Sequence, residues 1–223
     1  MEQLLDTFFA DLHTIIKPID ACLDLAMHAG HCEKQWAEKI KVDWRKQQFL
    51  AVWGFVRLEL SKFLNIPADD IIFLRTDYGK PYIKNPNIDL SFNISHTKNH
   101  IALCYRKNIK ACGIDIEIPR DMEDMLSIAK RFYAPEEFAF INSLDHKEKQ
   151  KYYFFKLWVI KEALLKTIGK GLSFGLDKVC IADFENNNQG VIELNYESQI
   201  KKLAWQFCDN NKKDYLKAIA IEV

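Results

Sequence analysis

The stretch that most constrains the fold of this chain is residues 113–118, where isoleucine alternates with acid in the run Gly-Ile-Asp-Ile-Glu-Ile. A period of two predicts a strand in which Ile114 and Ile116 enter a core while Asp115 and Glu117 emerge side by side on the other face. The two carboxylates would then stand about 7 Å apart. Hard oxygen ligands of this kind suit Mg²⁺. An edge strand with a solvated acidic face would show the same pattern.

The composition is that of a globular protein with ample material for a core, because 48% of the residues are hydrophobic and 13% are aromatic. Lys and Arg number 31, as do Asp and Glu, and this balance argues against nucleic acid or an anionic membrane as a partner. No apolar run is long enough to span a bilayer, and the N-terminus lacks the basic region of a secretory signal. The six cysteines show no metal-ligand spacing, so we predict free thiols in a cytoplasmic protein.

Two long helical patterns flank the acidic strand. Apolar residues recur at intervals of three and four over residues 35–64 and again over residues 145–169, where a glycine ends the pattern. Weaker helical patterns cover residues 122–132, residues 135–142 and the segment before Pro18. Short alternating runs predict further strands at residues 22–27, 71–74, 89–95, 101–105, 178–182, 191–194, 203–208 and 215–223.

These patterns predict an α+β fold made of two halves, residues 1–110 and residues 111–223. Each half would be a long helix packed on a small, mostly antiparallel sheet. The acidic strand would then lie where the halves meet.

A second cluster of charged residues lies on the helix predicted after residue 145. Glu162 and Lys166 are four residues apart, so they share one helix face, and an exposed pair of this kind is worth only a few tenths of a kcal/mol. Trp158 lies on the same face, which indicates partial burial. A half-buried carboxylate needs a partner, and a metal ion shared with Asp115 and Glu117 would supply one.

A third cluster follows the strand predicted at residues 89–95. It combines hydroxyl, imidazole and basic groups near a glycine, as a phosphate pocket requires, and comprises Asn93, Ser95, His96, Arg75, Gly79 and Lys80. A lone histidine after a strand is also common for structural reasons alone. The chain has no GxxxxGK[ST], GxSxG or HExxH motif.

Taken in order, the runs Gly-Lys-Pro at 79–81, Phe-Asn-Ile-Ser-His at 92–96, Gly-Ile-Asp-Ile-Glu at 113–117 and Trp-Val-Ile-Lys-Glu-Ala-Leu-Leu-Lys at 158–166 resemble the motifs of 4′-phosphopantetheinyl transferases of the Sfp type. The resemblance covers roughly residues 45–175. It implies two pseudo-symmetric α/β halves with an active site at their junction. It also implies a monomer that binds coenzyme A and Mg²⁺ and moves the phosphopantetheine arm onto a serine of an acyl or peptidyl carrier protein.

The resemblance implies roles for individual residues. Asp115, Glu117 and Glu162 would hold Mg²⁺, with Glu117 contacting the ion directly or through water. Glu162, Lys166, Asp115 and His96 would form the catalytic group, with Glu162 the first candidate for the general base. The segments expected to contact coenzyme A comprise Arg45, Arg75, Gly79, Lys80, Pro81, Asn93, Ser95, His96 and Lys166.

Agreement with the family pattern is weaker towards the N-terminus. Gln48 and Trp53 stand where family members often carry arginine, so Arg45 or Lys46 would take over the nucleotide contact. Residues 1–34 match no motif. Two alternatives are a Mg²⁺-dependent phosphodiesterase that uses the same acids, and an inactive module that binds coenzyme A or a carrier.

Overall fold

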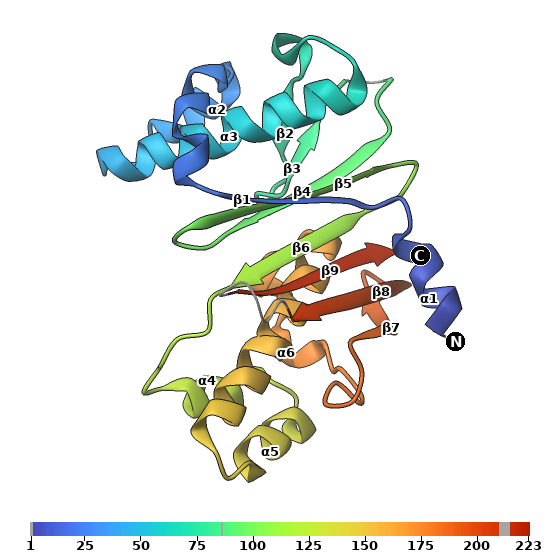
Figure 1. Cartoon of the computed structure of the whole chain (residues 1–223). Coiled ribbons are helices and arrows are strands. Elements are labelled where there is room, and N and C mark those ends of the chain that lie inside the picture. The colour runs from blue at the N-terminus through green and yellow to red at the C-terminus, as the bar shows by residue number, and fades with distance from the viewer. Residues whose placement is uncertain (1, 86, 210–214) are drawn as a thin grey trace.

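The computed structural model describes residues 2–85, 87–209 and 215–223 (Figure 1). The helices are α1 (Glu2–Phe9), α2 (His31–Ala37), α3 (Asp43–Leu64), α4 (Met125–Phe132), α5 (Pro135–Ser143) and α6 (Lys147–Ile168). The 3-10 helices are η1 (Asp20–His28), η2 (Ala68–Asp70), η3 (Gly171–Phe174) and η4 (Leu176–Lys178). The strands are β1 (His13–Pro18), β2 (Phe73–Arg75), β3 (Pro81–Ile83), β4 (Leu90–His96), β5 (His100–Lys107), β6 (Cys112–Glu117), β7 (Gln189–Tyr196), β8 (Gln199–Asp209) and β9 (Leu216–Glu222).

Antiparallel pairing organises the strands into two main sheets and a small hairpin. The first sheet has the order β1-β5-β4, the hairpin is β2-β3, and the second sheet has the order β6-β9-β8-β7. The predicted α+β fold with two sheet-containing halves is therefore confirmed.

Each main sheet packs against one helix of 22 residues. Helix α3 covers the first sheet through a core that includes Trp53, Phe55, Phe92 and Leu103. Helix α6 packs on the second sheet in a separate core with apolar residues of β8 and β9. Figure 1 shows α3 on one side of the molecule and α4, α5 and α6 on the other, with the two sheets between them.

The two sheets meet where β4 lies beside β6, and a third core covers this junction on the face opposite α6. It joins side chains from α1, both sheets and the segment before β9, among them Phe9, Cys104, Ile114, Ile116 and Ile221. The predicted burial of Ile114 and Ile116 is confirmed, because they are 0% and 1% exposed. Within the described residues, no helix has the length and apolar content needed to cross a membrane.

Three predictions of local structure are wrong. The predicted helix before Pro18 contains α1 but ends at Phe9, and the β-branched residues that follow form β1, which pairs with β5. Residues 22–27 lie in the 3-10 helix η1, whose backbone carbonyl at Leu25 packs against Gly54 of α3. Residues 178–182 form no strand, because Val179 and Ile181 are buried by packing under α6 instead.

The helix predicted over residues 35–64 is two helices, α2 and α3, separated at residues 38–42. The helices predicted over residues 122–132, 135–142 and 145–169 are observed within three residues of the expected bounds as α4, α5 and α6. Helix α3 ends at Leu64, and the capping residue Asn65 adopts the left-handed conformation with φ 55°.

The glycine that opens the acidic strand allows α6 to approach β6 closely. A Cβ atom at Gly113 would lie 2.1 Å from the carbonyl oxygen of Ala163 and 2.6 Å from Oγ1 of Thr167. Both contacts are too short for real atoms, so a side chain here would force the helix away from the strand. Gly113 therefore fixes the separation between the strand that carries Asp115 and the helix that carries Lys166.

Replacing this glycine tests the close approach. We expect Gly113→Ala to lower the free energy of unfolding by about 2 kcal/mol or more, because the overlap involves helix backbone as well as a side chain. Chemical denaturation measures the change. Val191→Ala on the edge strand β7 is the control, with an expected loss below about 1 kcal/mol. Equal losses in the two variants would contradict the role of Gly113.

Candidate active site

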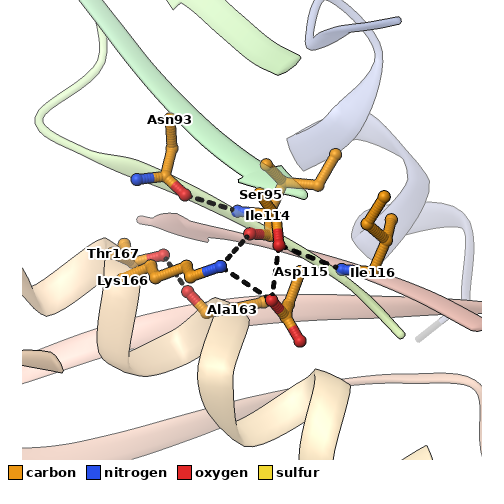
Figure 2. A network of polar contacts seen from close by, with 8 residues as sticks. All are labelled: Asn93, Ser95, Ile114, Asp115, Ile116, Ala163, Lys166 and Thr167. Carbon is orange, nitrogen blue, oxygen red and sulfur yellow. Dashed lines mark hydrogen bonds and ion pairs between the residues drawn. The ribbon is translucent and has the colours of Figure 1, made fainter. Parts of the chain in front are cut away.

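Asp115 occupies the centre of the junction, and its side chain is bonded from both sides (Figure 2). Its Oδ1 accepts a hydrogen bond of 2.7 Å from Oγ of Ser95 on β4 and pairs at 2.7 Å with Nζ of Lys166 on α6. Lys166 also donates to the carbonyl oxygen of Ile114 at 3.2 Å. Asp115 is only 5% exposed, so the structure corrects the expectation that this carboxylate simply emerges from the sheet.

The second carboxylate oxygen of Asp115, Oδ2, is buried, and no donor among the described residues bonds to it. Burying a charged oxygen without a donor is costly, so this atom marks a place where a cationic or donor group is missing from the protein itself.

Glu162 and Glu117 share the electrostatic environment of Asp115. Burial raises the pKa of Glu162 to about 7, with the negative charges of Asp115 and Glu117 adding to the rise and Lys166 opposing it. Burial and Asp115 also raise the pKa of Glu117, whereas Arg120, paired with it at 3.2 Å, lowers it. The three acids predicted from the sequence therefore lie close enough to perturb one another.

His96 ends β4 close enough to Lys166 and Asp115 for their charges to act on its ring. Its pKa is lowered by partial removal from water and then by the positive charge of Lys166, while Asp115 acts in the opposite direction. The imidazole ring is therefore biased towards its neutral form next to Lys166.

Two predicted coenzyme A contacts are engaged with the backbone of β6. Oδ1 of Asn93 accepts the N–H of Ile114 at 3.1 Å, and Oγ of Ser95 accepts the N–H of Ile116 at 3.4 Å (Figure 2). Both side chains are buried. They link the two sheets at the point where Asp115 stands.

Lys80 reaches from the β2-β3 hairpin to the other half of the chain. Its Nζ donates to the carbonyl oxygens of Cys112 at 3.2 Å and Thr167 at 3.0 Å. Burial lowers the pKa of this ammonium group. Lys80 and Pro81 line a cavity of about 380 Å³ between the halves, and Lys201 lines it from the second sheet.

The remaining predicted contacts lie in the N-terminal part of the chain, and no described contact joins them to the acids. Gly79 takes φ +84° in the turn of the hairpin, which explains the glycine there. Arg75 stacks 4.1 Å over the ring of Trp36. Arg45 is exposed in the first turn of α3, beside Trp44.

Two family models match this chain, one on each side of the boundary between the two main sheets. Residues 28–108 match the family model described as 4′-phosphopantetheinyl transferase, N-terminal. Residues 111–220 match the model of the 4′-phosphopantetheinyl transferase superfamily. This chain belongs to that superfamily. The predicted family is therefore confirmed.

Several named transferases are similar to this member of the superfamily. The 4′-phosphopantetheinyl transferase HetI of Nostoc sp. is 33% identical over 159 residues, which cover 70% of this chain and 66% of HetI. The 4′-phosphopantetheinyl transferase Sfp of Bacillus subtilis is 36% identical over 62% of this chain and 59% of its own length. The corresponding gsp protein of Aneurinibacillus migulanus is 38% identical over 55% and 51%. The matched segments thus span about half to two thirds of these relatives.

The acids of this superfamily member fit a hard divalent cation. Three carboxylates, Asp115, Glu117 and Glu162, face two cations, Lys166 and Arg120, so the site carries an excess negative charge once all three acids are ionised. The unpartnered Oδ2 of Asp115 is an oxygen of the kind that Mg²⁺ accepts. Over residues 2–85, 87–209 and 215–223, no set of three acidic, His or Cys side chains is already drawn together as a metal centre.

Lys161 precedes Glu162 in the sequence, but the structure separates it from the acids of the site. Lys161 is fully buried on another face of α6, where its Nζ pairs with Glu137 at 2.6 Å and donates to the carbonyl oxygens of Leu176 and Val179. This lysine holds the segment after α6 in place.

Sequence reasoning also missed two residues near the site. Arg120 pairs with Glu117, and its position three residues after that acid was a signal. Ser91 accepts the backbone N–H of Cys112 at 3.0 Å, and its spacing of two from Asn93 could have indicated a shared role.

The raised pKa of Glu162 predicts how stability changes with pH in the absence of divalent cations. A carboxyl group whose pKa rises from 4.5 to about 7 on folding stabilises the folded chain at low pH, and this contribution is lost as pH rises through 7. We expect Glu162→Gln to become more stable than the wild type by on the order of 2 kcal/mol between pH 5 and pH 8. Denaturation in a chelator at several pH values measures this difference.

Glu148→Gln, at an exposed position in the first turn of the same helix, is the matched control. Its stability should stay within about 0.5 kcal/mol of that of the wild type, because the Glu148 side chain is exposed in its ion pair with Lys151. Parallel pH curves for the wild type and Glu162→Gln would contradict the burial of that carboxyl group.

Proposed function

We propose that this chain transfers the 4′-phosphopantetheine arm of coenzyme A to a serine of an acyl or peptidyl carrier protein, with Mg²⁺ as cofactor. The observation that carries the proposal is the junction itself. Ser95, from the part matched by the N-terminal family model, and Lys166, from the part matched by the superfamily model, meet on the carboxylate of Asp115. The names of the similar proteins support the same transfer.

In the proposed reaction, the serine hydroxyl of the carrier attacks the β-phosphorus of coenzyme A. A bond forms between the serine oxygen and that phosphorus. The bond from the phosphorus to the bridging oxygen breaks, and 3′,5′-ADP leaves with the electron pair. Steps of this kind depend mainly on positioning and on stabilising negative charge.

The residues of the junction divide this work. Lys166 supplies a positive charge to the phosphates, and His96 supplies a ring nitrogen at the end of β4. Glu162 accepts the serine proton, because it is a half-buried carboxylate beside Asp115. Ser95 and Asn93 hold the backbone that carries Asp115.

Asp115, Glu117 and Glu162 are the residues that would hold Mg²⁺. When bound, the ion neutralises phosphate charge as a Lewis acid. Lys166 pairs with Oδ1 of Asp115, so Oδ2, which has no donor among the described residues, would be the oxygen that this residue offers to the ion.

We place the nucleotide of coenzyme A beside the β2-β3 hairpin. The cavity lined by Lys80 and Pro81 opens between the halves there, which supports this placement. Arg45, Arg75 and Gly79 belong to the same proposal, on the family resemblance alone.

We also propose a cellular compartment, an oligomeric state and a division into halves for this chain. A cytoplasmic monomer with halves at residues 1–110 and 111–223 is supported by six unpaired cysteines and by the presence of both sheets in one chain. Helix α1 crosses this division, because Phe9 packs in the core shared by the two sheets.

Substitution of the two central acids tests the proposed function. We expect Asp115→Asn and Glu162→Gln each to lower the transfer rate by on the order of 10²–10³, because each removes a group that manages charge in the transition state. Mass spectrometry of apo-acyl and apo-peptidyl carrier proteins incubated with coenzyme A and Mg²⁺ measures the added arm. Glu148→Gln is the control and should retain full activity.

The same assay separates the alternatives. A phosphodiesterase would release 3′,5′-ADP without a carrier, and an inactive binding module would bind coenzyme A without modifying any carrier. Either result, or near-normal turnover in Asp115→Asn, would contradict the proposed transfer.

A further inference from the structure

Three alternate side chains of β4 hold the backbone of β6. Oγ of Ser91, Oδ1 of Asn93 and Oγ of Ser95 accept the N–H groups of Cys112, Ile114 and Ile116 at 3.0, 3.1 and 3.4 Å. We call these three hydrogen bonds the junction ladder. Residue numbers rise by two on both β4 and β6 from one hydrogen bond to the next, so the two strands run in the same direction. Side chains of β4, and not its backbone, make these bonds.

The junction ladder accepts hydrogen bonds from three N–H groups of β6 that point away from β9. On its other edge β6 pairs with β9 in antiparallel register, with Asp115 opposite Ala218. Cys112, Ile114 and Ile116 are all 0% or 1% exposed, so their N–H groups cannot turn to water. Each must find an acceptor inside the protein, and β4 supplies one to each.

The ladder also fixes where the catalytic carboxylate stands. Asp115 lies between Ile114 and Ile116, and the N–H groups of both neighbours are held by β4. A shift of β6 along β4 would break the Ser95 contact to Oδ1, and a one-residue slip would turn Asp115 to the opposite face.

We propose that Ser91 and Asn93 are positioning residues that hold Asp115 in register with Ser95 and His96. Neither side chain has a described bond to an acid of the site, so their effect passes through the backbone of β6. This inference rests on the proposed transfer. It differs from the family resemblance, which places Asn93 among the coenzyme A contacts, because Oδ1 of Asn93 is bonded to Ile114 and the residue is 4% exposed.

A merely structural role would lower stability without a specific loss of rate, so the test separates the two effects. The variants Ser91→Ala and Asn93→Ala remove an acceptor, whereas Ser91→Thr keeps one. Ile94→Ala is the matched control, since Ile94 lies on the same strand but packs into the core under α3. Each variant is assayed for kcat, for KM of coenzyme A, for melting temperature and for amide hydrogen exchange at residues 112, 114 and 116.

We expect the two variants that lose an acceptor to lower kcat roughly ten- to hundredfold, because small misplacements of a catalytic group have effects of this size. Exchange should accelerate at Cys112 in Ser91→Ala and at Ile114 in Asn93→Ala. The variant Ser91→Thr should recover most of the rate and the amide protection at Cys112. Ile94→Ala should lower the melting temperature but leave kcat near the wild-type value while the chain is folded.

Several outcomes would overturn the inference. Unchanged kcat in folded Ser91→Ala and Asn93→Ala would do so, as would a rise in KM alone, which would make Ser91 a ligand contact in the adjoining cavity. Unchanged amide protection at Ile114 in Asn93→Ala would refute the ladder even if the wild type modified no carrier. Absence of transfer by the wild type, with the exchange pattern as expected, would instead refute the proposed function and leave the ladder supported.

Discussion

The partly buried ion pair between Asp115 and Lys166 is the interaction on which the rest of the site depends. A carboxylate at 5% exposure requires compensation, and here the compensation comes from both halves of the chain. Lys166 approaches from α6, and Ser95 approaches from β4. Because Ser95 and Lys166 come from different halves, the full set of contacts to Asp115 exists only where the two sheets meet.

Packing brings these partners within reach. The absence of a side chain at Gly113 lets α6 lie directly on β6, and Lys80 spans from the hairpin to the carbonyl oxygens of Cys112 and Thr167. A residue that the family resemblance links to the nucleotide is thus also a structural tie between the halves. Its ammonium group satisfies the carbonyl oxygen of Thr167 in the last turn of α6, where intrahelical donors are missing.

Sequence periodicity predicted the strand and the helix face that carry the site. It could not predict the contacts between residues that are far apart in the sequence. The alternation at residues 113–118 indicated the strand, and the spacing of Glu162 and Lys166 indicated a shared helix face. Nothing local could show that Lys161, the neighbour of Glu162, pairs with Glu137 instead. The strand β1 was missed because its β-branched residues adjoin a true helix, and its pairing with β5 joins residues far apart in sequence.

Two of the ion pairs made by α6, Lys161–Glu137 and Lys166–Asp115, show how a structural acid differs from one available for chemistry. Glu137 is fully satisfied, because its Oε1 accepts the N–H of Ile181 while its Oε2 accepts Lys161 and the N–H of Ala134. Oδ1 of Asp115 pairs with Lys166, whereas Oδ2 is buried and has no donor among the described residues. An unpartnered oxygen is not sufficient evidence, since Glu33 also has one beside Arg57. What sets Asp115 apart is the presence of two further carboxylates whose pKa values it raises, so that local negative charge exceeds what the protein neutralises.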